Sequence, residues 1–129
     1  MMKKIIIVLV ALVLVLSLSA CSKKYTNISN SELQDMLDNN YDEYQFIDVR
    51  TIDEYYTVHI EGFNTVIDYY LLDEDHSLLD GLDKDIPVVI MCNSGNRSVD
   101  ASNIFADEGF VKVYNLKNGI EGWVGETTN

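Results

Sequence analysis

The sequence predicts an α/β domain with a mainly parallel sheet, and three observations support this class. Beyond residue 24, short segments rich in β-branched and aromatic residues alternate with segments of helical apolar spacing. One of the short segments, residues 87–91, is apolar at every position, as in a parallel strand that is buried on both faces. Two of the helical segments begin with a capping-box pattern. Such alternation favours a parallel sheet with helices packed on it.

The first half of the domain is predicted to contain two helices and two strands. The capping box at residues 29–32 begins a helix, because apolar residues recur behind it at helical spacing. Residues 45–49 form a short buried strand. A second capping box, at residues 51–54, begins a short helix that runs through Tyr56, and residues 64–67 form the next strand.

The second half is predicted to continue the alternation. Residues 69–82 contain two pairs of leucines and form one or two short helices. After the apolar strand and a polar loop, a helix runs over residues 98–108 and stops at Gly109. Residues 111–116 form the last strand, and residues 119–124 form a short closing helix.

A targeting segment precedes the domain. Lys3 and Lys4 are followed by twelve apolar residues, 5–16, a run shorter than the roughly 18 residues expected of a membrane-spanning helix. A positive start, a short apolar run and small residues are the plan of a secretory signal. Residues 18–21 read Leu-Ser-Ala-Cys, which resembles the lipobox of bacterial lipoproteins, where the cysteine is acylated.

This resemblance implies a lipid-anchored protein on the extracytoplasmic face of a cell membrane, because two acyl chains give stable anchoring. We therefore divide the chain into a signal peptide (residues 1–20), a lipidated Cys21 with a short tether (residues 21–24), and a folded domain (residues 25–129). The alternatives are an ordinary cleaved signal with a chance cysteine, and an uncleaved anchor.

The composition argues against several classes of function. The chain has 21 Asp and Glu against 9 Lys and Arg, a net charge of −12. It therefore lacks the basic footprint of a nucleic-acid-binding protein and a basic patch for anionic lipid. Two histidines without clustered thiols offer no metal site of ordinary spacing, and we expect no cofactor. With Cys21 acylated, Cys92 is the only free thiol. We also expect the protein to be a monomer.

The segment that carries the chemistry is the loop of residues 92–98, between the apolar strand and the following helix. Ligands of open α/β sheets bind at the carboxyl ends of strands, and a helix start presents backbone N–H groups to them. In that position the helix end and the nearby Arg97 favour the reactive thiolate of Cys92. Gly95 lets the loop curl, Arg97 offers a forked cation to an anionic substrate, and Ser98 caps the helix. The alternative is a buried Cys92 that acts as a small hydrophobic residue.

Several motifs together resemble the rhodanese family of sulfurtransferases. The loop resembles the family's Cys-x-x-Gly-x-Arg-Ser. The other matching pieces are Asp48-Val49-Arg50, Glu54-Tyr55, the segment from His59 to Asn64 and the segment from Asn115 to Trp123. They follow the family's order and cover nearly the whole domain. The sequence departs from the family pattern at Val58, Glu61, Phe63 and Asn118, all outside the loop. The resemblance implies a three-layer α/β/α domain with a mainly parallel five-stranded sheet.

The resemblance also implies a mechanism. The Cys92 thiolate takes a sulfane sulfur from a small donor (thiosulfate, a polysulfide or a persulfide) and passes it to a thiophilic acceptor. Arg97 is the second catalytic residue. The persulfide is held by the backbone N–H groups of the loop, whose remaining residues are Asn93, Ser94, Gly95, Asn96 and Ser98. The residues expected to brace the site are Asp48, Arg50 and His59.

Two other readings stay open. A domain of this kind can serve as a persulfide carrier or redox-sensing module at the membrane without rapid turnover. The other reading is a phosphatase or an arsenate reductase. Relatives with five residues between the cysteine and the arginine act as phosphatases; here four residues lie between Cys92 and Arg97, which suits a sulfur atom better than a phosphoryl group. The acidic net charge also predicts poor steering of a dianion such as thiosulfate.

Overall fold

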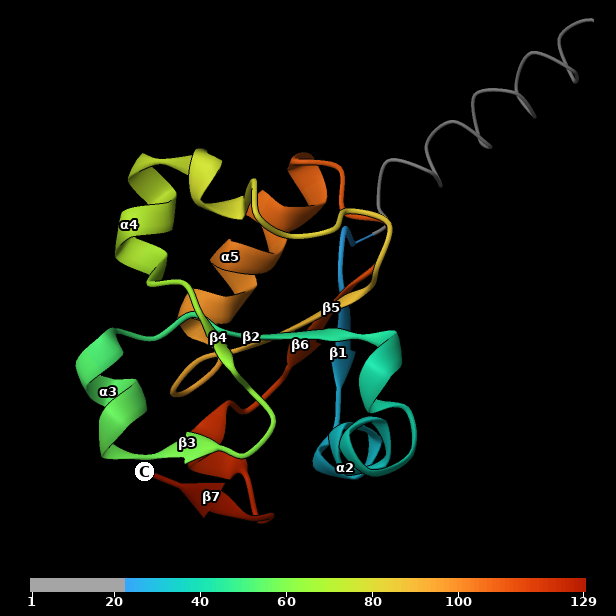
Figure 1. The fold of residues 1–129 in the computed structure, drawn as a ribbon, viewed down its shortest axis with the longest axis vertical. Helices are drawn as coiled ribbons and strands as arrows, with labels where there is room; N and C mark the ends of the chain where they lie inside the picture. Colours follow the sequence, from blue (N-terminus) through green and yellow to red (C-terminus); the bar gives the residue numbers. More distant parts are fainter. Residues whose placement is uncertain (1–22) are drawn as a thin grey trace, which may run out of the picture.

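The structure is a computed structural model that describes residues 23–129 (Figure 1). The predicted signal peptide and Cys21 lie outside the described residues. Within the part that is described, no helix combines the length and the apolar character needed to cross a membrane.

The centre of the domain is a five-stranded sheet in which every pair of neighbouring strands is parallel. The strand order is β1-β6-β5-β2-β4. The strands are β1 (Thr26–Ile28), β2 (Gln45–Asp48), β4 (Thr65–Val66), β5 (Val88–Met91) and β6 (Val113–Leu116). The apolar segment predicted as a buried strand is the middle strand, β5, and all four of its residues are buried. The predicted fold class is confirmed.

The described part of the chain contains four α-helices (Figure 1). They are α2 (Asn30–Asn39), α3 (Ile52–Thr57), α4 (Tyr69–Glu74) and α5 (Asn96–Asp107). Alternate strand residues face opposite layers, as the pleat requires. On one face Ile90 packs with Leu72 of α4 and Phe105 of α5. On the other face Met91 packs with Leu33 of α2. The domain therefore has helices on both sides of one sheet.

Local signals in the sequence explain where most helices begin and end. Ser29 accepts a hydrogen bond from the backbone N–H of Glu32 at the start of α2. Thr51 and Glu54 form the complete reciprocal capping box at the start of α3. Gly109 follows the end of α5 with a φ of 95°, the left-handed conformation that stops a helix.

Residues 69–82 contain two short helices, as predicted: α4 and a 3₁₀ turn, η2 (His76–Leu79). Other elements differ from the prediction. The closing helix is a single 3₁₀ turn, η3 (Ile120–Gly122). A further 3₁₀ turn, η1 (Tyr41–Glu43), was not predicted, and neither was edge strand β1. A small antiparallel sheet joins β3 (His59–Ile60) to β7 (Thr127–Thr128). These strands have two or three residues, too few to show a period of two.

Candidate active site

Cys92 follows the last residue of β5, at the carboxyl end of the sheet. Its side chain is 1% exposed. The backbone N–H of Gly95 donates to Sγ of Cys92 at 3.1 Å, the thiol donates to Oγ of Ser98 at 3.3 Å, and that hydroxyl donates to the carbonyl of Gly95 at 3.2 Å. The sulfur is therefore held in a closed ring of hydrogen bonds made by its own loop.

The curl of the loop depends on two glycines. Gly95 has a φ of 104°, and a Cβ there would lie 2.3 Å from the carbonyl oxygen of Lys117. Gly119 has a φ of 60°, and a Cβ there would lie 2.5 Å from the carbonyl oxygen of Cys92. The segment after β6 also donates to the loop, from the N–H of Ile120 to the carbonyl of Cys92 at 2.9 Å. Close backbone packing between the two segments thus fixes the shape of the loop.

The start of α5 presents unpaired amides beside the sulfur. The helix begins at Asn96, two residues earlier than predicted, with Gly95 as an N-cap that has no side chain to offer. Ser98 does not cap the helix, contrary to the prediction, because it lies in the first turn with its hydroxyl bonded within the loop. Within the described chain, no atom accepts a hydrogen bond from the backbone N–H groups of Ser94, Asn96, Arg97 and Ser98. Such free donors at a helix start suit an anion.

The polar side chains of the loop turn away from the sulfur or lie at the surface. Asn93 donates from Nδ2 to the carboxylate of Glu121 at 2.9 Å. Ser94 and Asn96 are exposed. A sulfur atom in this loop would therefore be held by backbone N–H groups and by Ser98. The side chains of Asn93, Ser94 and Asn96 do not contact it.

Arg97 is paired within the protein. Its guanidinium donates to both carboxylate oxygens of Glu54, at 2.7 and 2.8 Å, and lies 5.8 Å from the ring centre of Tyr70. The hydrogen bonds from Arg97 lower the pKa of Glu54 to about 2, although burial opposes this. The same bonds raise the pKa of Arg97, and the charge of Cys92 adds to that effect. The fork expected to face an anionic substrate is thus already occupied.

Glu54 is the site residue that sequence reasoning missed. The capping box and the family motif both drew attention to it, but only as a helix start and a match. The N3 position of α3 aims its carboxylate at the loop, where it also accepts from the N–H and the hydroxyl of Thr51, at 3.4 and 3.2 Å. One side chain therefore joins the start of α3 to the reactive loop.

The three residues predicted to brace the site lie together around α3. Arg50 donates from Nη2 to Asp48 at 2.8 Å and to the carbonyl of Val58 at 2.7 Å, and the Asp48–Arg50 ion pair is buried. Nδ1 of His59 donates a hydrogen bond to the carbonyl of Tyr55 at 2.9 Å. The His59 ring also stacks on the Tyr55 ring, with 3.8 Å between the ring centres. These contacts hold the carboxyl-terminal part of α3, the helix that carries Glu54.

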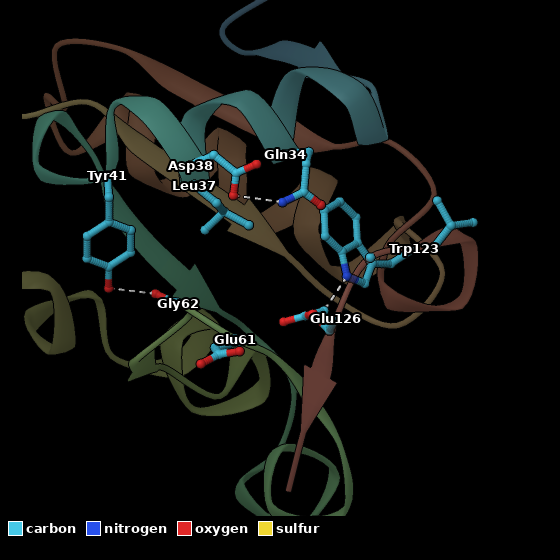
Figure 2. A pocket seen from close by; sticks show the side chains of 10 residues that line it. Gln34, Leu37, Asp38, Tyr41, Glu61, Gly62, Trp123 and Glu126 are labelled. Atoms are coloured by element: carbon cyan, nitrogen blue, oxygen red, sulfur yellow. Dashed lines mark hydrogen bonds between the residues drawn. The ribbon is translucent and has the colours of Figure 1, made fainter.

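A separate cavity of about 680 Å³ lies between α2, the turn after β3 and the C-terminal segment (Figure 2). Its lining residues are Gln34, Leu37, Asp38, Tyr41, Glu61, Gly62, Trp123, Val124, Gly125 and Glu126. No residue of the Cys92 loop is among them. Across residues 23–129, no group of three His, Cys, Asp or Glu side chains gathers as a metal site.

A cysteine at the carboxyl end of a central parallel strand, with a backbone N–H of its own loop bonded to the sulfur, is the arrangement of a thiol-based α/β active site. The profile of the Rhodanese-like domain family matches residues 29–126, and the chain belongs to this family. This confirms the family resemblance seen in the motifs.

Individual relatives agree with that assignment. The chain is 34% identical over 82 residues to thiosulfate sulfurtransferase GlpE of Pseudomonas paraeruginosa, covering 61% of this chain and 68% of the relative. It is 35% identical over 81 residues to the putative sulfur carrier protein YrkF of Bacillus subtilis, covering 63% of this chain and 42% of the relative. A rhodanese-like domain protein from Staphylococcus aureus has the same fold, with a TM-score of 0.66 at 24% identity over 78% of this chain and 93% of that one.

Proposed function

We propose that this protein is a rhodanese-type sulfurtransferase that carries a sulfane sulfur on Cys92. The observation that carries the proposal is the cradle of N–H groups at the start of α5. One of them already donates to Sγ, and four have no acceptor within the described chain. A persulfide is anionic, and fixed amide donors stabilise anionic sulfur without having to reorganise. Kinship with a thiosulfate sulfurtransferase supports the same chemistry.

The transfer needs no external oxidant or reductant. The Cys92 thiolate attacks the outer sulfur of a donor R–S–SH, a new S–S bond forms, and the donor's S–S bond breaks. The electron pair leaves on R–S⁻, which takes up the proton of the transferred outer sulfur and departs as R–SH. With thiosulfate the leaving group is sulfite, which departs with two negative charges. In both cases a thiol or thiolate acceptor then attacks the outer sulfur of the Cys92 persulfide and regenerates the thiolate.

The test is an intact-mass measurement on the reduced domain, residues 23–129, after exposure to thiosulfate or to an organic persulfide. A gain of about 32 Da, one sulfur atom, is expected for the native protein and not for Cys92→Ser. The serine variant keeps a hydrogen-bonding group of similar size and should stay folded, which circular dichroism checks. Sulfur loading that persists in Cys92→Ser, or no loading of folded native protein by either donor, would overturn the proposal.

A sulfur-carrier role is the second candidate, and the burial of Cys92 favours it. A side chain that is 1% exposed must be uncovered before a donor or acceptor reaches it. The named carrier from Bacillus subtilis supports the same reading. Repeated turnover with excess donor and a small thiol distinguishes the two roles. An enzyme forms product in large excess over protein, whereas a carrier loads once and then releases its sulfur slowly until a partner protein is added.

We further propose that a lipid on Cys21 holds the domain at the extracytoplasmic face of the membrane. The order of basic, apolar and small residues before Cys21 supports this. Detergent phase partitioning of the full chain expressed in a bacterium tests it. The native chain should enter the detergent phase, and Cys21→Ala should lose that property.

A further inference from the structure

The charge at the mouth of the Cys92 loop is unusual for a site that would take a dianion. Arg97 is the only Asp, Glu, Lys or Arg residue of the loop 92–98. Both arms of its guanidinium are bonded to Glu54. The fork that would grip an oxyanion bidentately is therefore filled by a carboxylate of the protein.

A second carboxylate contacts the loop at Asn93. Glu121 accepts from the side chain of Asn93 at 2.9 Å, and its backbone N–H donates to the carbonyl of Asn93 at 3.0 Å. Lys117 contacts Gly95 through its backbone carbonyl. It lines a surface pocket together with Asn30 and Glu32, and no residue of the Cys92 loop lines that pocket. The charged side chains bonded to the loop are therefore two carboxylates, against the one cation that the loop contains.

Donors differ in how much charge they bring to these surroundings. Thiosulfate arrives as a dianion, and its sulfite leaving group carries both charges away past Glu54 and Glu121. A persulfide of an uncharged thiol brings at most one charge, and its leaving thiol is neutral after taking up the proton of the outer sulfur. Like charges placed close together at a partly buried site are unfavourable, because little water lies between them.

We propose that Glu54 and Glu121 act as specificity residues that make the Cys92 site select sulfur donors of low charge, namely persulfides of uncharged thiols, over thiosulfate. The inference rests on the proposed function, since it concerns the choice of donor for the same Cys92 chemistry. Glu54 acts by neutralising the only cation of the loop. Glu121 acts by adding a negative charge at its edge.

The test compares rates of sulfur loading from two donors, thiosulfate and the persulfide of N-acetylcysteamine, by rapid quench and intact mass. The variants are Glu54→Gln, Glu121→Gln and the double variant. Glutamine is suited to the N3 position of a capping box, so Glu54→Gln should keep α3 intact. Glu43→Gln is the control for net charge, because it removes one carboxylate from η1, before the amino end of β2.

The expected result is a change in the ratio of second-order rate constants, thiosulfate over persulfide. That ratio should rise about tenfold in the double variant, equal to about 1.4 kcal/mol, and by less in each single variant. The control should keep the native ratio. Screening supplies a second readout: added salt should speed loading from thiosulfate in the native protein and speed it less in the double variant.

Three results would overturn the inference. They are an unchanged ratio in the folded double variant, an equal rise in Glu43→Gln, and a native protein that loads faster from thiosulfate than from the persulfide. If Glu54→Gln fails to fold, Glu121→Gln decides alone, since its side chain caps no helix. Failure of the proposed function looks different, because neither donor would then load Cys92 in any variant.

Discussion

Asp48 and Arg50, two residues apart at the end of β2, form an ion pair that is almost completely shielded from water. Three guanidinium-to-carboxylate hydrogen bonds of 2.8–3.2 Å join them, and the backbone N–H of Arg50 adds a fourth. Arg50 also reaches the carbonyl of Val58, the residue that ends α3. The pair therefore ties the sheet to the helix that carries Glu54.

Arg50→Met should be strongly destabilising, because it leaves Asp48 as a buried charge without its partner. We expect a loss of about 3–5 kcal/mol in the free energy of unfolding, measured by urea denaturation. The control is Lys24→Met, which breaks the exposed ion pair of Lys24 with Asp107, whose side chains are 57% and 56% exposed. That change should cost about 0–1 kcal/mol. Equal costs would show that burial of the Asp48 pair is unimportant.

Gly95→Ala should damage the reactive loop more than an alanine at a comparable glycine. Both Gly95 and Gly109 have left-handed backbones, but an added Cβ meets the carbonyl of Lys117 only at Gly95; at Gly109 nothing lies within 4 Å. Gly109→Ala should cost about 1–2 kcal/mol from conformation alone. Gly95→Ala should cost more and should slow sulfur loading. Equal stability losses with unchanged loading would contradict the close packing of the two loops.

Ser98→Ala should slow loading of Cys92, because its hydroxyl links Sγ to the carbonyl of Gly95. The matched control is Ser102→Ala, one turn further along α5, whose buried hydroxyl donates to the carbonyl of Ser98 at 2.6 Å. Each variant should lose about 1–2 kcal/mol of stability. Only Ser98→Ala should reduce the loading rate, by about three- to tenfold, a free-energy difference near that of one hydrogen bond. A similar rate loss in both would assign the effect to packing.

The stability that the Glu54–Arg97 ion pair adds to the folded protein should depend on pH. The pKa of Glu54 is lowered in the folded protein from 4.5 to about 2, chiefly by the hydrogen bonds from Arg97. The ion pair should therefore contribute fully above pH 4.5, and its contribution should disappear as the pH falls from 4.5 to about 2. Since the carboxylate is a third exposed, we expect only about 1 kcal/mol.

The measurement is the difference in unfolding free energy between the native protein and Glu54→Gln at several pH values in that range. The same comparison in an Arg97→Gln background is the control, because the cause of the lowered pKa is then removed. A difference that stays constant with pH in the native background would contradict the ion pair.

The fold was largely predictable because its strongest elements carry local signals. The fully apolar β5, the two capping boxes and the glycine after α5 each have a cause within a few residues. The edge strand β1 and the small β3–β7 sheet have no such cause, since their pairing partners lie far along the chain. Their short and partly polar segments take strand form only through those partners.

The place of the site in the fold was predictable from the sequence, and the pairing of its charges was not. The position of Cys92 after an apolar strand and before a helix follows from the order of residues. The pairing of Arg97 with Glu54 joins residues 43 positions apart, and no local pattern announces it. Ser98 was wrongly predicted to cap α5. The helix begins two residues earlier, at Asn96, and its N-cap is Gly95, which has no side chain that could signal a cap.

The direction of α5 has a consequence for how the reactive thiol is presented. The helix starts in the loop of Cys92 and ends at Asp107, whose carboxylate is bonded to Lys24 of the tether. Its 12 residues span about 18 Å. A lipid on Cys21 would therefore hold the domain by the pole opposite its sulfur. The end of the domain that carries the reactive loop would then face the surrounding water, from which donors and acceptors would approach it, and not the bilayer.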